Sequence, residues 1–199
     1  MRVEKNDCSM NDSFRYPESG MPLLEARRAI DALRGQRFVN RMTGIVAQLS
    51  SSAKGKLISN KATGKSKANG FTREQHNVIA ANVGLLFEAA RLVESRPDRD
   101  SDANILSIKR FARNVIFGKK KAVAWITVKE SKQHGHHIYS VEAIKVEALD
   151  RIVEVVSGNT PHASSASTQS RITSLTRFVN WLWRCVGRGN IWKGKMHEK

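Results

Sequence analysis

Apolar positions recur at helical spacing in the first half of the chain. Between residues 22 and 49, Leu24, Ile30, Leu33 and Val39 repeat at about 3.6 residues, and Gly35 is a natural break. A second helix is predicted from an N-cap at Thr72 to about residue 93, because a Ser-Arg-Pro-Asp sequence at 95–98 follows it and proline disfavours helix before it. Two helical segments are therefore expected, with a loop at 50–70 that holds a short helix near 55–59.

The pattern changes to a two-residue period after residue 104. Residues 108–117, 122–129 and 136–147 alternate as strands do, and Trp125, Thr127 and Lys129 fall on one side of the second run. Residues 118–121 read as a hairpin turn between the first two runs, and the polar stretch 131–135 joins the second run to the third. Periodicity leaves residues 148–156 open between a short helix and a fourth strand.

The order of these elements predicts an α+β fold. It consists of two N-terminal helical segments followed by an antiparallel meander of three or four strands, plus an appended C-terminal amphipathic helix. We divide the chain into a polar tail and first helix (1–36), an α+β domain (37–157), and a basic linker with the amphipathic helix (158–199).

Charge adds an expectation about partners. The 199 residues include 34 Lys and Arg against 18 Asp and Glu, a formal net charge of +16. Residues 37–72 contain basic but no acidic side chains, and residues 159–199 contain a single acidic one, whereas the segments 1–36 and 73–158 are close to balanced. Clustered positive charge favours nucleic acid as partner, with an anionic membrane surface or no polyanion as alternatives.

The C-terminal segment predicts a basic amphipathic helix. Ile172, Leu175, Val179 and Leu182 share one side, and tryptophans and arginines occupy much of the rest. Such a helix could bind nucleic acid, contact a membrane surface, or dock on protein. No transmembrane segment is expected, because no apolar run approaches the roughly 20 residues that a span requires. Cys8 and Cys185 lie near opposite ends, so we expect reduced thiols in a cytoplasmic protein.

Short motifs spread over residues 43–148 resemble a known family. They are Leu85-Leu86-Phe87-Glu88-Ala89-Ala90, Arg96-Pro97-Asp98, Lys109-Arg110-Phe111, Thr127-Val128-Lys129-Glu130 and Gly135-His136-His137-Ile138-Tyr139-Ser140. In this order they resemble a domain of the large polyvalent proteins of phages and mobile elements. The run is also similar to phage nucleases of the barnase, EndoU, colicin and RelE type.

This resemblance implies an α+β domain with a curved antiparallel sheet and a metal-independent ribonuclease activity, in a toxin or effector that can be delivered into a host cell. An acidic immunity or antitoxin protein is the partner expected for that class. Two alternatives stay open from the residues: a nucleic-acid-binding module without catalysis, or an effector acting on a host protein or membrane through the C-terminal helix. RNA is favoured over DNA as the nucleic acid.

Metal-independent RNA cleavage needs a base, an acid and cations around the phosphate. His76 is a candidate for proton transfer or a capping residue, and His136 is a candidate on the third strand. Arg110 could clamp phosphate or pair with Glu88 or Asp98. The remaining catalytic candidates are Lys129, which could instead be a solvated edge lysine, and Tyr139, whose neighbour Ser140 points to the opposite face.

Nine further positive side chains are candidate nucleic-acid contacts. They are Lys54, Lys56, Lys61, Lys65, Lys67, Arg113, Lys119, Lys120 and Lys121. We expect no metal site, because His136 and His137 face opposite sides of a strand and no cysteine lies near them. No cofactor is expected either.

Overall fold

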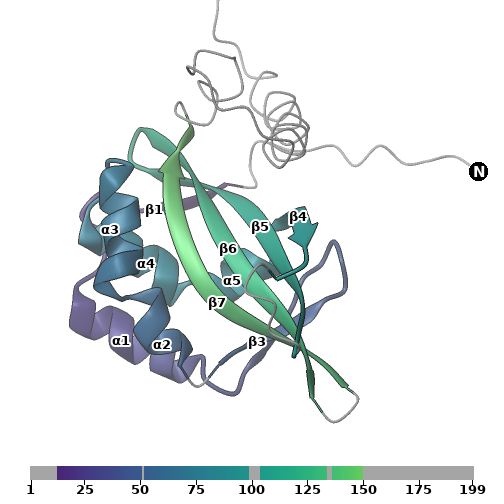
Figure 1. The fold of residues 1–199 in the computed structure, drawn as a ribbon. Helices are drawn as coiled ribbons and strands as arrows, with labels where there is room; N and C mark the ends of the chain where they lie inside the picture. The colour runs from purple at the N-terminus through teal and green to yellow at the C-terminus, as the bar shows by residue number, and fades with distance from the viewer. Residues whose placement is uncertain (1–12, 51, 99–103, 134–135, 150–199) are drawn as a thin grey trace, which may run out of the picture.

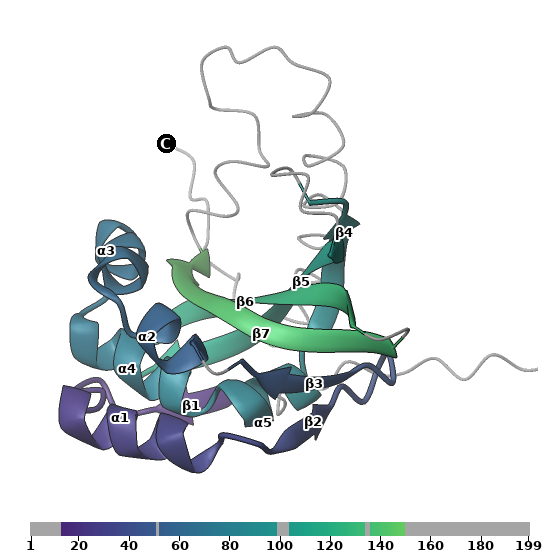
Figure 2. The same cartoon turned by 60° about the horizontal axis from the view of Figure 1, so that its bottom comes forward.

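Seven strands form one curled, mixed sheet, and the helices gather mainly on one side of it (Figures 1 and 2). The computed structural model describes residues 13–50, 52–98, 104–133 and 136–149. The strands are β1 (Phe14–Tyr16), β2 (Arg37–Val39), β3 (Val46–Leu49), β4 (Arg91–Arg96), β5 (Ile105–Phe117), β6 (Lys120–Gln133) and β7 (His136–Ala148). The helices are α1 (Leu23–Ala32), α2 (Ala53–Leu57), α3 (Asn60–Ala68), α4 (Arg73–Ala81) and α5 (Val83–Glu88).

The three long strands lie where the sequence predicted strands, and neighbouring ones pair antiparallel. β5 pairs with β6 from Ile105↔Ser131 to Phe117↔Lys120, and β6 pairs with β7. The turn between β5 and β6 contains Gly118 at a φ of 56°, a left-handed conformation that favours glycine. All three strands extend beyond the predicted ranges, because their ends continue to pair after the apolar alternation stops.

The predicted fold class was nevertheless wrong, because the sheet is larger and mixed. Its order is β1-β5-β6-β7-β3-β2, and β4 pairs with β5 off this path. β1 runs parallel to β5, and β3 runs parallel to β7. Strands of three to six residues hold too few positions to establish a two-residue period, so the pattern at 14–16, 37–39, 46–49 and 91–96 could not reveal them.

The second predicted helix is two helices and a strand. Its start is confirmed, because Thr72 and Gln75 form a reciprocal capping box at the beginning of α4. The helix ends at Ala81, where Asn82 turns the chain and donates from Nδ2 to the Val78 carbonyl. After α5 the backbone becomes extended at Arg91 and pairs with β5, so tertiary pairing overrides the helical pattern there.

The two faces of the long strands differ in what covers them. The inner face points toward the helices and carries the fully buried side chains of Phe111, Ile126 and Val128. In Figure 2, α4 and α5 lie on this side, and α5 contacts β5 and β6. The outer face is the opposite one, and it carries Arg110 and Trp125. A sheet with unlike faces can present one surface to a ligand while the other maintains the core.

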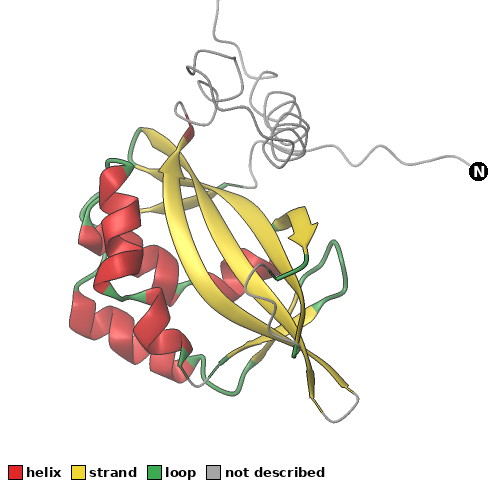
Figure 3. Cartoon of the chain, in the orientation of Figure 1, coloured by secondary structure: helices red, strands yellow, loops and turns green. Residues whose placement is uncertain are grey.

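Helices α2 and α3 take a different position from α4 and α5. Both contact β7, and α3 stands beside that strand rather than across the sheet (Figure 2). The region between residues 50 and 70, which was expected to be mostly loop, therefore consists of two short helices (Figure 3). Backbone capping explains α3, because the Ser59 hydroxyl accepts from the Ala62 N–H at 3.1 Å.

A buried asparagine fixes the loop between β2 and β3. Asn40 is fully buried, and its Nδ2 donates to the Phe87 carbonyl at 2.6 Å and the Ala90 carbonyl at 2.7 Å. Its Oδ1 accepts from the backbone and hydroxyl of Thr43. Next to it, Gly84 of α5 allows close contact with Phe38, because a Cβ there would lie 2.4 Å from the ring. This junction joins the β2–β3 hairpin to α5.

None of the helices in the described ranges is long and apolar enough to cross a membrane. The predicted C-terminal amphipathic helix, both cysteines and the polar tail up to residue 12 lie outside the described residues.

The Asn40→Ala substitution should strongly destabilise the protein. It removes the hydrogen bonds of a fully buried amide to the Phe87 and Ala90 carbonyls and to Thr43, so we expect a loss on the order of 3 kcal/mol in the free energy of unfolding. Urea denaturation measures this loss as a lower midpoint with an unchanged m-value. Gln36→Ala, which removes an exposed hydrogen bond to Ala32, is the control and should change stability by less than about 0.5 kcal/mol. Equal midpoints for the two variants would contradict the role of Asn40.

Candidate functional site

A basic hollow lies on the outer face of the sheet, beside α2 and α3. Its volume is about 730 Å³. Its floor comes from β5, β6 and β7, and its wall comes from α2 and α3. Six basic side chains and one carboxylate line it: Lys56, Lys61, Lys65, Arg96, Arg110, Lys145 and Glu142. This excess of cations makes the hollow suited to an anionic ligand.

The Arg110 guanidinium lies over the floor of the hollow. Its carbon is 4.8 Å from the centre of the Trp125 ring, a cation–π distance. Arg110 also pairs with the Glu94 carboxylate at 3.4 Å, and Arg96 approaches the same carboxylate at 3.6 Å. The predicted ion-pair partners of Arg110 were Glu88 or Asp98, but Glu94 of the neighbouring strand β4 takes this place because it is the residue opposite in the register.

The hollow has one carboxylate of its own. The Glu142 side chain is 13% exposed and forms an ion pair with the Lys56 ammonium of α2. This contact joins the wall of the hollow to its floor across 86 residues of sequence. The sequence predicted no such pairing, because it depends on how α2 lies against β7.

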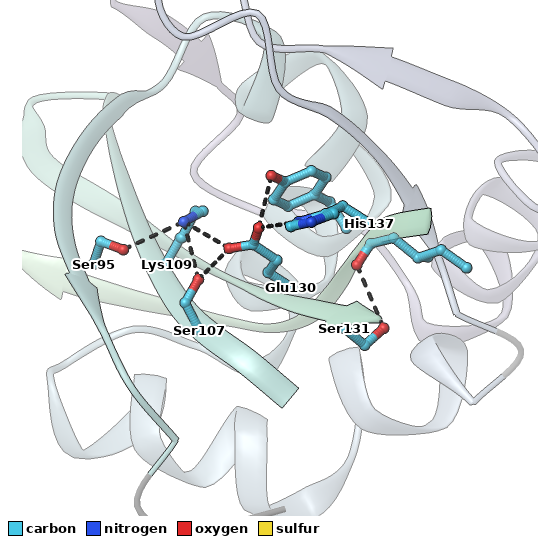
Figure 4. A network of polar contacts seen from close by, with 8 residues as sticks. Ser95, Ser107, Lys109, Glu130, Ser131 and His137 are labelled. Carbon is cyan, nitrogen blue, oxygen red and sulfur yellow. Dashed lines mark hydrogen bonds and ion pairs between the residues drawn. The ribbon is translucent and has the colours of Figure 1, made fainter. Parts of the chain in front are cut away.

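A second group of polar side chains lies on the inner face, near the start of β5, the end of β6 and the start of β7 (Figure 4). The Glu130 carboxylate accepts from four groups there. His137 Nδ1 lies at 2.8 Å and Tyr139 Oη at 2.9 Å from Oε1, while Ser107 Oγ at 2.5 Å and Lys109 Nζ at 3.0 Å contact Oε2. The His137 side chain is 54% exposed, so this Glu130 cluster reaches solvent through its imidazole.

The hydrogen bonds set the ionisation of this cluster. Burial alone would raise the pKa of Glu130, but the donors from Ser107, His137, Lys109 and Tyr139 outweigh it and lower the pKa to about 2. Burial and the adjacent carboxylate together raise the pKa of the Tyr139 hydroxyl. At neutral pH the carboxylate is therefore charged and the phenol is protonated.

The predicted catalytic residues do not share one cleft. Arg110 lines the hollow, and Lys129 lies on the same outer face between Ile108 and Ser140 but not among the residues that line it. Tyr139 lies on the inner face in the Glu130 cluster. His136 begins β7 opposite Gln133, and its side chain lies outside the described part. The structure thus separates Arg110 from Tyr139 by the thickness of the sheet.

His76 is a buried structural residue. It is 0% exposed, and both ring nitrogens have partners, with Leu57 O at 2.7 Å from Nε2 and Ser66 Oγ at 2.8 Å from Nδ1. Because the carbonyl can only accept, Nε2 carries the proton and Nδ1 accepts from Ser66. Ser66 Oγ in turn accepts from the Val146 N–H at 3.2 Å. This series of hydrogen bonds ties α2, α3 and α4 to β7, and it leaves His76 no access to a substrate.

The candidate nucleic-acid contacts fall into three groups. Lys56, Lys61 and Lys65 line the hollow. Three others have structural contacts: Lys54 pairs with Asp31, Arg113 donates to the Ala89 carbonyl, and Lys120 donates to the Gly70 carbonyl. Lys67, Lys119 and Lys121 are exposed elsewhere on the surface. The basic segment 37–72 therefore contributes to a site mainly through α2 and α3.

Several residues that belong to these two sites were not predicted from the sequence. They are Glu130, Ser107 and Lys109 of the inner cluster, and Glu94, Arg96 and Lys145 of the hollow and its surroundings. Two-residue alternation on β5 and β6 could have placed Lys109 and Glu130 on the core side of the sheet, where a charged residue needs a partner. In the described ranges, no three His, Cys, Asp or Glu side chains gather as a metal site.

Comparison with known families gives one match over more than half of the chain. Residues 24–139 match the family described as large polyvalent protein-associated domain 3. The chain belongs to this family. The match starts in α1 and ends in β7, so it includes α2, α3 and Arg110 as well as Glu130 and Tyr139. No curated protein and no solved structure matches the chain.

His76 should make the stability of this family member depend on pH. Burial lowers the pKa of His76 more than the Leu57 hydrogen bond raises it, so the folded protein holds the ring neutral. Below an unfolded pKa of about 6.5 the unfolded chain takes up a proton that the folded chain resists. Stability from this residue is therefore present above about pH 6.5 and falls by up to about 1.4 kcal/mol per pH unit below it.

Denaturant unfolding between about pH 7 and 5 tests this expectation by comparing the wild type with His76→Gln. The variant should be less stable at neutral pH but lose less stability on acidification. Parallel pH profiles for the two proteins would refute a neutral buried His76.

Proposed function

We propose that this protein binds RNA as a single strand through the basic hollow on the outer face. The observation that carries the proposal is the set of six basic side chains around a concavity of about 730 Å³. Four of them come from the sheet and the segment before α3, and Lys61 and Lys65 come from α3 itself. Phosphate groups along the wall would neutralise this charge.

The shape and the aromatic floor favour a single strand over a duplex. Single-strand sites combine a positive groove with planar groups on which unstacked bases lie. Arg110 provides such a planar group, and its guanidinium carbon lies 4.8 Å from the centre of the Trp125 ring. A duplex keeps its base faces inside its own stack, so it could offer only phosphates to this floor. RNA in preference to DNA is part of this proposal, and the binding of DNA of the same sequence tests it.

Lys61 and Lys65 are suited to phosphate contact because both are exposed and lie four residues apart on α3, hence on one side of the helix. The Ser59 cap and the contacts of Ser66 and Asn69 with Val146 fix α3 against β7. The two ammonium groups therefore project from a supported helix toward the hollow.

Neutralising these two lysines should weaken RNA binding in a salt-dependent manner. For Lys61→Gln combined with Lys65→Gln, the slope of log Kd against log salt should fall by about 1.4, since each phosphate contact with a single strand contributes about 0.7. Fluorescence anisotropy with a labelled single-stranded RNA measures this slope, and DNA of the same sequence tests the preference for RNA.

Arg27→Gln combined with Arg28→Gln is the matched control. Both arginines are exposed on α1, which lies on the helix side of the sheet and not at the hollow (Figure 2). This control removes the same charge and should keep the wild-type slope. Equal losses in both double variants would show that binding follows net charge and does not use the hollow.

The Glu130 cluster favours a second function, metal-independent cleavage of RNA. Glu130 holds His137 through Nδ1, which leaves Nε2 as the ring nitrogen for a ligand. His137 would take the proton of the 2′-hydroxyl, the 2′-oxygen would attack phosphorus, and the bond to the 5′-oxygen would break as that oxygen gains a proton. Lys109 and Tyr139 lie beside the same carboxylate as a cation and a proton donor.

Cleavage is tested by incubating the full chain with RNA in EDTA. We expect strand scission by the wild type and a loss of about 100-fold or more for His137→Ala, the usual effect of removing a general acid or base. Added imidazole should restore part of the variant's activity if the lost group transfers a proton. Intact RNA with the wild type, or full activity of the variant, would eliminate this second function without affecting the binding proposal.

A further inference from the structure

Glu142 is out of place in a site for a polyanion. A carboxylate repels phosphate, yet this one lines the hollow among six basic side chains. Of the described residues, only Lys56 lies at ion-pair distance from it, through Oε2. Oε1 therefore keeps its acceptor capacity for a ligand, and Oε2 keeps a second lone pair beside Lys56, so the carboxylate can accept from two donors. A group that can only accept hydrogen bonds suits the donor edge of a base better than a phosphate.

A β-bulge gives Glu142 its position. Thr127 pairs with Ala143 and the next residue, Val128, pairs with Val141, so Glu142 has no partner in the register. An extra residue of this kind re-aims a side chain, and bulges are common next to binding sites. Here it brings both Glu142 and Ala143 to the hollow while Val141 and Ile144 stay in the core.

The floor between Glu142 and Arg110 consists of small side chains. Arg110 pairs with Thr127, and Thr127 pairs with Ala143, so these residues form one row across β5, β6 and β7. Two strand spacings of about 4.8 Å separate the ends of this row, so the backbone of Arg110 lies about 10 Å from β7, the strand that carries Glu142. A planar base that stacks on the guanidinium and reaches across Thr127 would therefore present its far edge to the carboxylate.

We propose that the hollow recognises a guanine base of single-stranded RNA, and that Glu142 determines this specificity by accepting hydrogen bonds from its N1–H and 2-amino groups. This inference rests on the proposed function. Guanine has two adjacent donors on one edge, which match an ionised carboxylate. Adenine and cytosine have a ring nitrogen acceptor beside their amino group, and uracil has its single N–H between two carbonyls. Lys56 fixes the carboxylate, and Arg110 stacks on the base.

Base substitution in the ligand tests the proposal without changing the protein. The probes are short oligouridylates with one central guanosine, inosine, adenosine or cytidine, measured by anisotropy against the full chain. The guanosine probe should bind roughly tenfold more tightly than the adenosine and cytidine probes. Inosine keeps N1–H but lacks the 2-amino group, so its affinity should lie between those of guanosine and adenosine.

Glu142→Gln tests the residue itself. The amide is nearly isosteric but replaces one acceptor with a donor, so the preference for guanosine over inosine and adenosine should disappear. Glu25→Gln removes the same charge from an exposed position on α1, and Glu25 does not line the hollow, so this control should keep the preference. Circular dichroism of both variants establishes that they fold as the wild type does.

Three results would overturn the inference. The first is an unchanged guanosine preference in Glu142→Gln, and the second is equal binding of all four probes by the wild type. The third is loss of RNA cleavage in Glu142→Gln with its base preference intact, which would make Glu142 a proton acceptor. If, in addition, the Lys61→Gln/Lys65→Gln variant binds RNA like the wild type, the proposed function fails together with the guanine inference. If the double lysine variant binds RNA more weakly while Glu142→Gln keeps the guanosine preference, the hollow binds RNA but Glu142 does not read the base.

Discussion

Burial of one face of the β5–β6–β7 meander against α4 and α5 is the constraint on which the rest of the structure depends. Side chains that alternate along a strand cannot all enter the core, so burying Phe111, Ile126 and Val128 forces Arg110, Trp125 and Thr127 to the other face. The two faces then acquire separate chemistry. The hollow belongs to the outer face and the Glu130 cluster to the inner face, near the ends of the strands.

His76 connects this core to the hollow. Its ring joins Leu57 of α2 to Ser66 of α3, and Ser66 accepts from β7, so one buried side chain holds both helices at the edge of the sheet. Those helices are the wall of the hollow and carry Lys56, Lys61 and Lys65. A histidine that the sequence suggested as catalytic thus contributes to the site by positioning its wall. Its neutral form is what allows this, because an imidazolium would be costly at a fully buried position.

The cations and the carboxylate of the hollow differ in how firmly their side chains are held. Lysines on α3 are exposed and can follow a phosphate backbone, whereas Arg110 is held by Trp125 and Glu94 and so keeps a fixed plane. Glu142 is fixed by Lys56 and by the bulge in β7. In the proposed binding mode, the exposed charges would supply affinity that declines with salt, and the fixed groups would supply discrimination. The inner cluster is organised around a single ionised carboxylate with four donors.

By itself, the sequence determined the long antiparallel strands, the capped start of α4 and the basic character of residues 37–72, because each depends on local periodicity or on composition. Only the tertiary structure decided the parallel pairings of β1 and β3, the extended course of the chain at β4, and the burial of His76. Those features arise between residues far apart in the sequence, such as Ser66 with Val146 or Lys56 with Glu142. The bulge at Glu142 is similar, since a register shift appears only when two strands are paired.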